Sequence, residues 1–411
     1  MQASVSTAPA VDAGDTPTAS GALTPFLYAL FFIWGGITSL NDVLIPKLKG
    51  LFHLNFGEAM LVQSAFFISY LLFSLPAGYL VARLGYMRSA VIGLLTMAVG
   101  AALFFPAAKL GMFVAFLPAL FVVAGGITVV QVVANPLVSL LGKPQLASSR
   151  LTFAQAFNSL GTALFPLVGS ILILGSAGAG VAGLAYLGIA AALLVVAAAV
   201  FLQRNQLHQR VESAPDPLAA FTLLKQPHFA FGALCIFFYV GAEVSIGSTI
   251  VSFLSQPSKL GISTLEAGNH IWIYWTGAMI GRFAGAFVLR KVSPGLALTV
   301  AALVNILLLA SAALVTGFVG GWSLLAIGLF NSIMFPTIFS VALEGLGKRT
   351  PEGSGILCMA IVGGAVIPLL TGKTADAIGL SMALAVPAVC YAIIAGFGWY
   401  ARRPLEAAIV A

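Results

Sequence analysis

The chain has 411 residues, of which 60% are hydrophobic and only 8% are charged. Soluble domains carry about 25% charged residues, so this composition excludes a water-soluble fold and indicates a membrane protein with several spans. The net charge of +7 does not indicate a nucleic-acid partner, because the basic residues stand singly or in pairs between apolar runs. Cys235, Cys358 and Cys390 lie inside apolar segments and match no metal-ligand or disulfide spacing.

Residues 1–23 are small and polar with no basic residue, which is typical of a disordered tail and not of a signal peptide. Apolar runs of about 20 residues then recur between short breaks, as expected of helices that cross a bilayer. The runs predict twelve spans, at 24–52, 58–82, 87–107, 111–141, 151–174, 179–203, 227–254, 265–289, 294–316, 320–345, 353–373 and 379–401.

One long polar connection, residues 204–226, divides these spans into two groups of six. The chain is therefore expected to form an N-terminal bundle over 24–203 and a C-terminal bundle over 227–403, followed by a tail at 404–411. Lys and Arg concentrate in alternate connections, the linker included, so the positive-inside rule places both termini in the cytoplasm.

An internal repeat links the two halves at offsets of roughly 200 residues. The repeated pairs are Glu58 with Glu266, Arg83 with Arg290, Pro136 with Pro336, and Pro166 with Pro368. The repeat predicts an all-α polytopic membrane protein with two pseudo-symmetric six-helix bundles related by an axis along the membrane normal. That arrangement resembles the major facilitator fold.

The first predicted span contains Asn41 and Asp42. A carboxylate inside a spanning helix costs at least ~2.5 kcal/mol, and such residues are usually functional or paired. We expect Asp42 to be a functional acid that faces a polar cavity, with Asn41 beside it as a candidate for substrate binding. The alternative is that Asp42 lies near the outer interface and is merely hydrated.

Spans four and five carry pairs of amides at helical spacing. Gln131 and Asn135 share one face, as do Gln155 and Asn158, and Pro136 frees a backbone carbonyl nearby. An amide both donates and accepts hydrogen bonds, which suits neighbouring sugar hydroxyls. The alternative is hydrogen bonding between helices inside the bundle.

The second half adds Tyr239 and Glu243 one turn apart in span seven, Tyr274 and Trp275 in span eight, and Asn331 in span ten. Aromatic rings with a polar edge stack well on the apolar face of a pyranose. The alternative for the aromatic residues is an interfacial belt. Glu243 is a second candidate for a functional acid or, equally, a hydrogen-bonded structural residue.

Glu243 and Arg282 lie on neighbouring spans but at different depths, on the order of 10 Å apart at 1.5 Å per residue. We therefore predict no ion pair between them. Arg282 is expected at the inner gate or with its side chain extended toward the cytoplasm.

The connection between spans two and three, from Gly78 to Gly85, resembles the major facilitator loop motif. Ala82 stands where that motif usually has Asp, while Arg83 is retained. The glycines allow a tight turn and close helix packing, so Gly78, Arg83 and Gly85 are expected to have a structural or gating role.

Several further strings resemble the fucose and glucose/galactose symporter family, most closely its bacterial glucose/galactose branch. They are Ser39–Pro46, Gln63–Phe67, Ala134–Pro136, Ala154–Gly161, Val240–Gly247, Gly281–Phe283 and Phe335–Ser340. The resemblance implies cation-coupled sugar uptake in which Asp42 takes part in proton coupling. Gln131 stands where the fucose:proton symporter has a second acid. Because glutamine cannot titrate, the resemblance implies that proton coupling runs on Asp42, with Glu243 as the further candidate. Sodium at Asp42 is an open alternative to the proton.

The sequence therefore predicts a secondary transporter of the bacterial inner membrane that takes up a hexose, such as glucose or galactose, by alternating access. Its partners are a small sugar, a proton or sodium ion and the lipid bilayer; it is expected to be a monomer without a cofactor or nucleic acid. The alternative is a cation-driven efflux antiporter of the same fold. An enzyme is not expected, because the histidines are scattered and no nucleophile elbow or phosphate-binding glycine loop is present.

Overall fold

The computed structural model describes residues 23–53, 56–169, 179–204 and 217–403, almost all of them helical. The first half consists of α1 (Leu23–Phe52), α2 (Phe56–Leu84), α3 (Tyr86–Leu110), α4 (Phe116–Leu140), α5 (Ala147–Gly169) and α6 (Ala179–Leu202). The second half consists of α7 (Pro227–Leu254), α8 (Thr264–Val288), α9 (Pro294–Leu314), α10 (Gly317–Asn331), α11 (Met334–Ala342), α12 (Thr350–Met359), α13 (Gly363–Ile378), α14 (Leu380–Ala383) and α15 (Ala385–Tyr400).

These helices form the twelve predicted rods, the last three of which are interrupted. Spans ten, eleven and twelve are α10 with α11, α12 with α13, and α14 with α15. The break in span ten falls just before Pro336, whose missing N–H leaves the carbonyl of Ser332 without its helical partner. In the described part of the chain, nine helical stretches are long and apolar enough to cross a membrane, and Thr24–Leu40 is a shorter apolar one.

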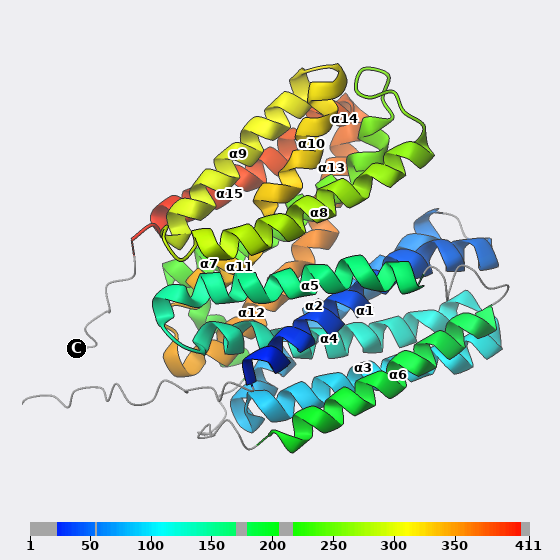
Figure 1. Cartoon of the computed structure of the whole chain (residues 1–411), viewed down its shortest axis with the longest axis vertical. Helices are drawn as coiled ribbons and strands as arrows, with labels where there is room; N and C mark the ends of the chain where they lie inside the picture. The colour runs from blue at the N-terminus through cyan, green and yellow to red at the C-terminus, as the bar shows by residue number, and fades with distance from the viewer. Residues whose placement is uncertain (1–22, 54–55, 170–178, 205–216, 404–411) are drawn as a thin grey trace, which may run out of the picture.

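The helices pack as two bundles lying side by side (Figure 1). In the first, α1 lies along α5, and α3 packs against both α4 and α6. In the second, α9 packs against α10 and α15, while α7 packs against α13 and α15. This two-bundle arrangement confirms the predicted fold class.

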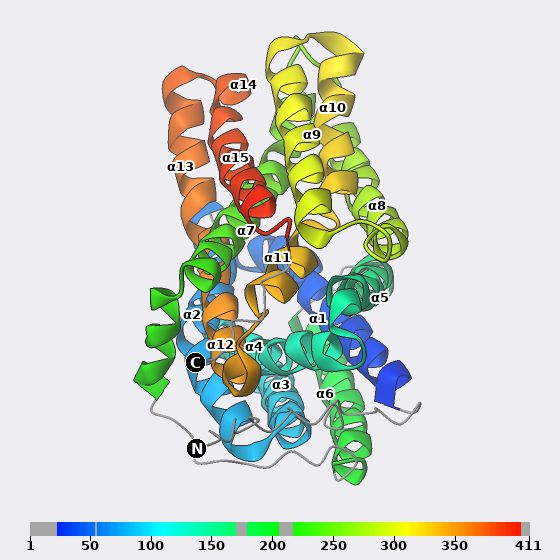
Figure 2. The ribbon, with the colours of Figure 1, turned by 90° about the vertical axis from the view of Figure 1, so that its left-hand side faces the viewer.

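Three helix pairs form most of the seam between the bundles: α2 with α12, α5 with α8, and α5 with α11 (Figure 2). A Cβ atom at Gly78 of α2 would lie 2.8 Å from the carbonyl oxygen of Pro351, and one at Gly355 would lie 2.8 Å from that of Ser74. The two backbones therefore meet where neither helix has a side chain. A hydrogen bond between the hydroxyls of Ser148 and Ser340 (2.7 Å) and one from Ser149 Oγ to the carbonyl of Ala286 (2.6 Å) close the same end of the seam.

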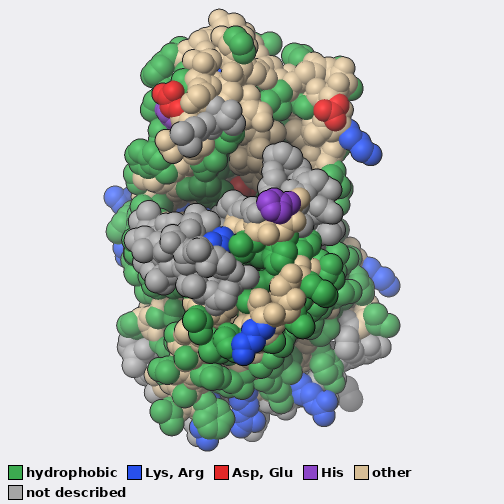
Figure 3. Space-filling view, turned by 90° about the vertical axis from the view of Figure 1, so that its right-hand side faces the viewer, with side chains coloured by type: hydrophobic (Ala, Val, Ile, Leu, Met, Phe, Trp, Pro, Cys, Tyr) green, Lys and Arg blue, Asp and Glu red, His purple; other side chains and the backbone are tan. Residues whose placement is uncertain are grey.

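The opposite end of the seam is open. The space-filling view from that end shows a hollow between the bundles, with an acidic side chain deep inside it (Figure 3).

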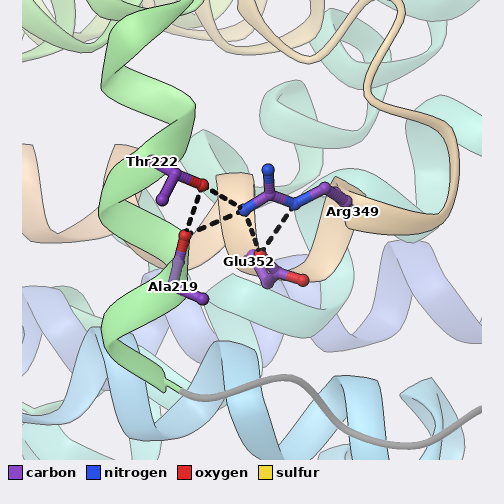
Figure 4. Close-up of polar contacts among 4 residues, drawn as sticks. All are labelled: Ala219, Thr222, Arg349 and Glu352. Atoms are coloured by element: carbon purple, nitrogen blue, oxygen red, sulfur yellow. Dashed lines mark hydrogen bonds and ion pairs between the residues drawn. The ribbon is translucent and has the colours of Figure 1, made fainter.

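The connection between the bundles contains a short 3₁₀ helix, η4 (Pro217–Lys225), within the predicted linker. Arg349, just before α12, donates to the carbonyl of Ala219 (2.9 Å) and to Thr222 Oγ1 (3.0 Å) of η4. The same guanidinium forms a salt bridge of 2.7 Å with Glu352 (Figure 4). Because η4 also packs against α2, this cluster joins the linker to both bundles at the closed end.

Candidate functional site

The predicted cation site lies on α1, whose backbone is helical through Asn41 and Asp42. The side chains of these two residues lie outside the described residues, so their roles stay predictions. The neighbouring geometry is described: Asn158 of α5 donates from Nδ2 to the carbonyl of Phe31 (3.2 Å) on α1. The amide of Asn158 therefore fastens the helix that carries Asp42 to α5.

The other three predicted amides of the first half form a buried polar wall on α4 and α5. Gln131 accepts a hydrogen bond from the hydroxyl of Tyr70 on α2 (2.7 Å), and Gln155 Nε2 donates to Asn135 Oδ1 (3.3 Å). Asn135 is fully buried, yet its Nδ2 has no hydrogen-bond partner among the described residues. A buried donor without a partner costs about 1–3 kcal/mol, so a polar ligand that reached it would gain that energy back.

Pro136 connects this wall to the opposite bundle. The proline cannot donate to the carbonyl of Val132, four residues earlier. The hydroxyl of Ser354 on α12 donates a hydrogen bond of 2.9 Å to that carbonyl. The freed backbone group in the first bundle is thus satisfied by a side chain of the second.

In the second bundle, the polar residues converge on Asn331 at the end of α10. Its Oδ1 accepts from Asn305 Nδ2 (2.8 Å) and from the hydroxyl of Tyr391 (2.6 Å). Its Nδ2 donates to the hydroxyl of Tyr274 (2.7 Å), and its carbonyl accepts from Tyr239 (3.1 Å). The predicted residues Tyr239, Tyr274 and Asn331 are thus brought into one buried network.

Glu243 joins this network through the hydroxyl of Tyr239, which donates to its Oε1 at 2.8 Å. Arg282 donates from Nε to the carbonyl of Ser332 (3.4 Å), and its guanidinium also bonds to the carbonyl of Gln155 and the hydroxyl of Ser159 on α5. Arg282 therefore bridges the two bundles, and its expected role at the inner gate stays a prediction.

The predicted absence of an ion pair between Glu243 and Arg282 agrees with the salt bridges of the described residues. The two side chains are linked indirectly at the break in span ten. Tyr239, the hydrogen-bond partner of Glu243, bonds to the carbonyl of Asn331, and Arg282 bonds to the carbonyl of the adjacent Ser332. The expected separation of Glu243 and Arg282 in depth stays a prediction.

The remaining predicted residues lie outside this network. Trp275 is 41% exposed and packs edge-on against Tyr274, with ring centroids 5.2 Å apart, so its role in substrate binding stays a prediction. Gly85 has a φ of 81° and makes the turn between α2 and α3. Arg83 is bonded to the hydroxyl of Tyr79 on its own helix at 3.5 Å.

Three residues of the site were missed from the sequence: Tyr70, Asn305 and Tyr391. Asn305 stands alone in the apolar run of span nine, and a lone intramembrane amide is itself a signal for a polar contact in the interior. The tyrosines could not be told from ordinary apolar core residues. No group of three or more His, Cys, Asp or Glu side chains that could hold a metal occurs within the described ranges.

Comparison with known proteins gives three findings. Residues 26–359 match the family model described as "Major Facilitator Superfamily". The "Glucose/galactose transporter" of Brucella abortus is 50% identical, with 90% of this chain and 92% of that protein aligned. The "L-fucose-proton symporter" of Escherichia coli is 32% identical, with 90% and 92% aligned.

A solved structure is also similar. The crystal structure of the transporter FucP in the outward conformation has a TM-score of 0.84 and 30% identity, covering 92% of this chain and 98% of FucP.

Proposed function

Because the chain belongs to the major facilitator superfamily, and is therefore a multi-pass membrane transporter and not an enzyme, we propose that it takes up a hexose, glucose or galactose, together with a proton. A glucose/galactose transporter is half identical along nine-tenths of the chain, and a fucose-proton symporter is about one-third identical. The proposed location is a bacterial inner membrane, with both termini in the cytoplasm.

The observation that carries the sugar assignment is the buried amide wall of Gln131, Asn135 and Gln155. Amides in a membrane interior are expensive unless they have partners, and this wall retains a free donor at Asn135 among the described residues. Vicinal hydroxyls both donate and accept, so a sugar matches such a wall better than an apolar substrate does. The aromatic rings of Tyr274 and Trp275 complete the proposed site from the second bundle.

In the proposed orientation, the closed end of the seam faces the cytoplasm and the hollow faces the outside. Sugar and proton enter the hollow, and protonation of Asp42 removes a charge that opposes closure over a dehydrated site. The bundles then rock about the bound sugar and open inward. Sodium at Asp42 would serve the same purpose, because a carboxylate with amide oxygens also suits a hard cation.

The test is counterflow in proteoliposomes loaded with unlabelled sugar, with labelled glucose, galactose, fucose, mannose and N-acetylglucosamine outside. Accumulation is then measured under a proton gradient and, separately, under a sodium gradient. We expect counterflow of glucose or galactose and accumulation under the proton gradient. Absence of counterflow for every sugar would overturn the substrate class, and accumulation under sodium alone would overturn the coupling ion.

A further inference from the structure

The hydroxyl of Tyr239 lies between two acceptors. It is 2.8 Å from Oε1 of Glu243 and 3.1 Å from the backbone carbonyl of Asn331. A phenol carries one hydrogen, so it can make only one of these two bonds at full strength. Tyr239 is fully buried, so its single O–H hydrogen points either to Glu243 or to the carbonyl of Asn331.

The side chain of Asn331 cannot rotate to follow the hydrogen of Tyr239, because its own polar atoms are already bonded. Both lone pairs of its Oδ1 are used by Asn305 and Tyr391, and its Nδ2 is held by Tyr274. The backbone carbonyl is left as the variable contact, and it belongs to the last residue of α10, directly before the break in span ten.

We propose that Glu243 is a proton-binding site of the C-terminal bundle, and that Tyr239 relays its occupancy to the break between α10 and α11. This inference rests on the proposed proton-coupled transport. When Glu243 is a carboxylate, Tyr239 donates to it. When Glu243 binds one proton from the aqueous cavity, its new O–H donates to the Tyr239 oxygen, and the tyrosine hydrogen turns to the carbonyl of Asn331. One proton is taken up and no covalent bond of the protein changes.

The break is also where the two bundles are connected. Arg282 holds the carbonyl of Ser332, which Pro336 has freed, and reaches across the seam to Gln155 and Ser159. Tyr239 and Arg282 thus bond to the carbonyls of adjacent residues, so a change at the carbonyl of Asn331 reaches the arginine through the same break.

Among the residues whose side chains are described, the other groups that face Glu243 are uncharged at neutral pH. The titratable ones are Tyr239 on its own helix, Tyr274 on α8 and Tyr391 on α15. On α13, which also packs against α7, the described titratable residues are Lys373 and Asp376, and both are exposed. Protonation of Glu243 thus acts on the break through one hydroxyl and on the seam through one guanidinium.

The test compares Tyr239→Phe and Glu243→Gln with a matched control, Tyr186→Phe. Tyr186 is equally buried and stacks on Phe104, but its hydroxyl has no partner in the described part of the chain. Sugar counterflow is measured from pH 5 to 9 without gradients, because this exchange needs only the conformational change. Infrared difference spectra between low and high pH record the C=O band of protonated carboxyls, a readout independent of transport.

We expect Glu243→Gln to lose one protonated-carboxyl band and one limb of the pH profile. Tyr239→Phe should keep that band at a shifted frequency and lose the pH response, and Tyr186→Phe should match the wild type. A wild-type pH profile in Glu243→Gln, or an unshifted band with a normal profile in Tyr239→Phe, would overturn the relay. Failure of the proposed function is distinct, because wild-type protein would then show no sugar counterflow at any pH.

Discussion

The polar networks of the two bundles are both built around buried amides and tyrosines. They differ in which polar atoms have hydrogen-bond partners. In the first bundle, Gln131 bonds to Tyr70, and Gln155 bonds to Asn135. The buried donor Nδ2 of Asn135 has no partner among the described residues. In the second bundle, Asn331 has partners for both lone pairs of Oδ1 and for its carbonyl, and the atom without a partner among the described residues is an acceptor, Oδ1 of Asn305. The first network thus leaves a donor unpaired at its centre, while the second is saturated at its centre, Asn331, and leaves one acceptor unpaired beside it.

The two repeated prolines show the same contrast. The carbonyl freed by Pro136 is taken by a hydroxyl, that of Ser354, and α4 continues through the proline without interruption. The carbonyl freed by Pro336 is taken by the guanidinium of Arg282, and the rod is broken into α10 and α11. A proline in the fourth span of each half thus lies within a continuous helix, α4, in the first half and beside a helix break, a candidate hinge, in the second.

The largest expected effect concerns the acid of the first bundle. Asp42→Asn should abolish accumulation of sugar against a gradient, because the site can no longer exchange its proton, while sugar counterflow continues. Accumulation and counterflow in proteoliposomes check this directly. Normal accumulation by Asp42→Asn would mean that the acid that couples sugar transport to the proton lies in the second bundle and not in the first.

A large effect is also expected at the seam. Gly78→Val places atoms where the carbonyl of Pro351 lies, so the closed end cannot form and transport should fall at least tenfold. Gly188→Val is the matched control, since a Cβ there meets nothing within 4 Å. Transport rates, with cysteine labelling from the cytoplasmic side, give the measurement. Equal rates in the two variants would contradict the close crossing.

An intermediate effect is expected in the amide wall. Gln155→Ala should raise the half-saturating sugar concentration about tenfold, which corresponds to about 1.4 kcal/mol for one lost hydrogen bond. Thr96→Ala serves as control, because Thr96 bonds only within its own helix in the described structure. The half-saturating concentration is measured from initial uptake rates over a range of sugar concentrations. An unchanged half-saturating concentration in Gln155→Ala would place this residue outside the site.

The smallest effect is expected at the linker. Arg349→Ala removes the bonds to Ala219 and Thr222 and the pair with Glu352, but Arg349 is itself 37% exposed. Glu352 beneath it is only 8% exposed, so the change leaves a buried carboxylate without its cation. We expect a loss of about 1–3 kcal/mol and a fall of a few degrees in the melting temperature. Arg83→Ala, which removes an arginine bonded within its own helix, is the comparison. A fall no larger than that of Arg83→Ala would mean that the cluster does not hold η4.

The number and bounds of the spans could be predicted because hydrophobic runs of membrane length leave little ambiguity in an apolar chain. The amides could be found because polar side chains in such runs need partners. What could not be predicted was which partners they choose: Asn305, Tyr391 and Tyr70 lie far along the chain from the residues they bind. The contacts of Arg282 across the seam could not be predicted for the same reason, since side-chain reach and helix breaks depend on packing between spans.

The hydrogen bond from Ser354 to the carbonyl of Val132 has a consequence for hydration. When the bundles part, that carbonyl loses its partner, and Pro136 keeps its own helix from supplying another. A water molecule must then occupy the place of the serine hydroxyl, because a bare carbonyl in the membrane interior costs several kcal/mol. Inward opening and wetting of this point are therefore a single event, and solutes that lower water activity outside the protein should slow it.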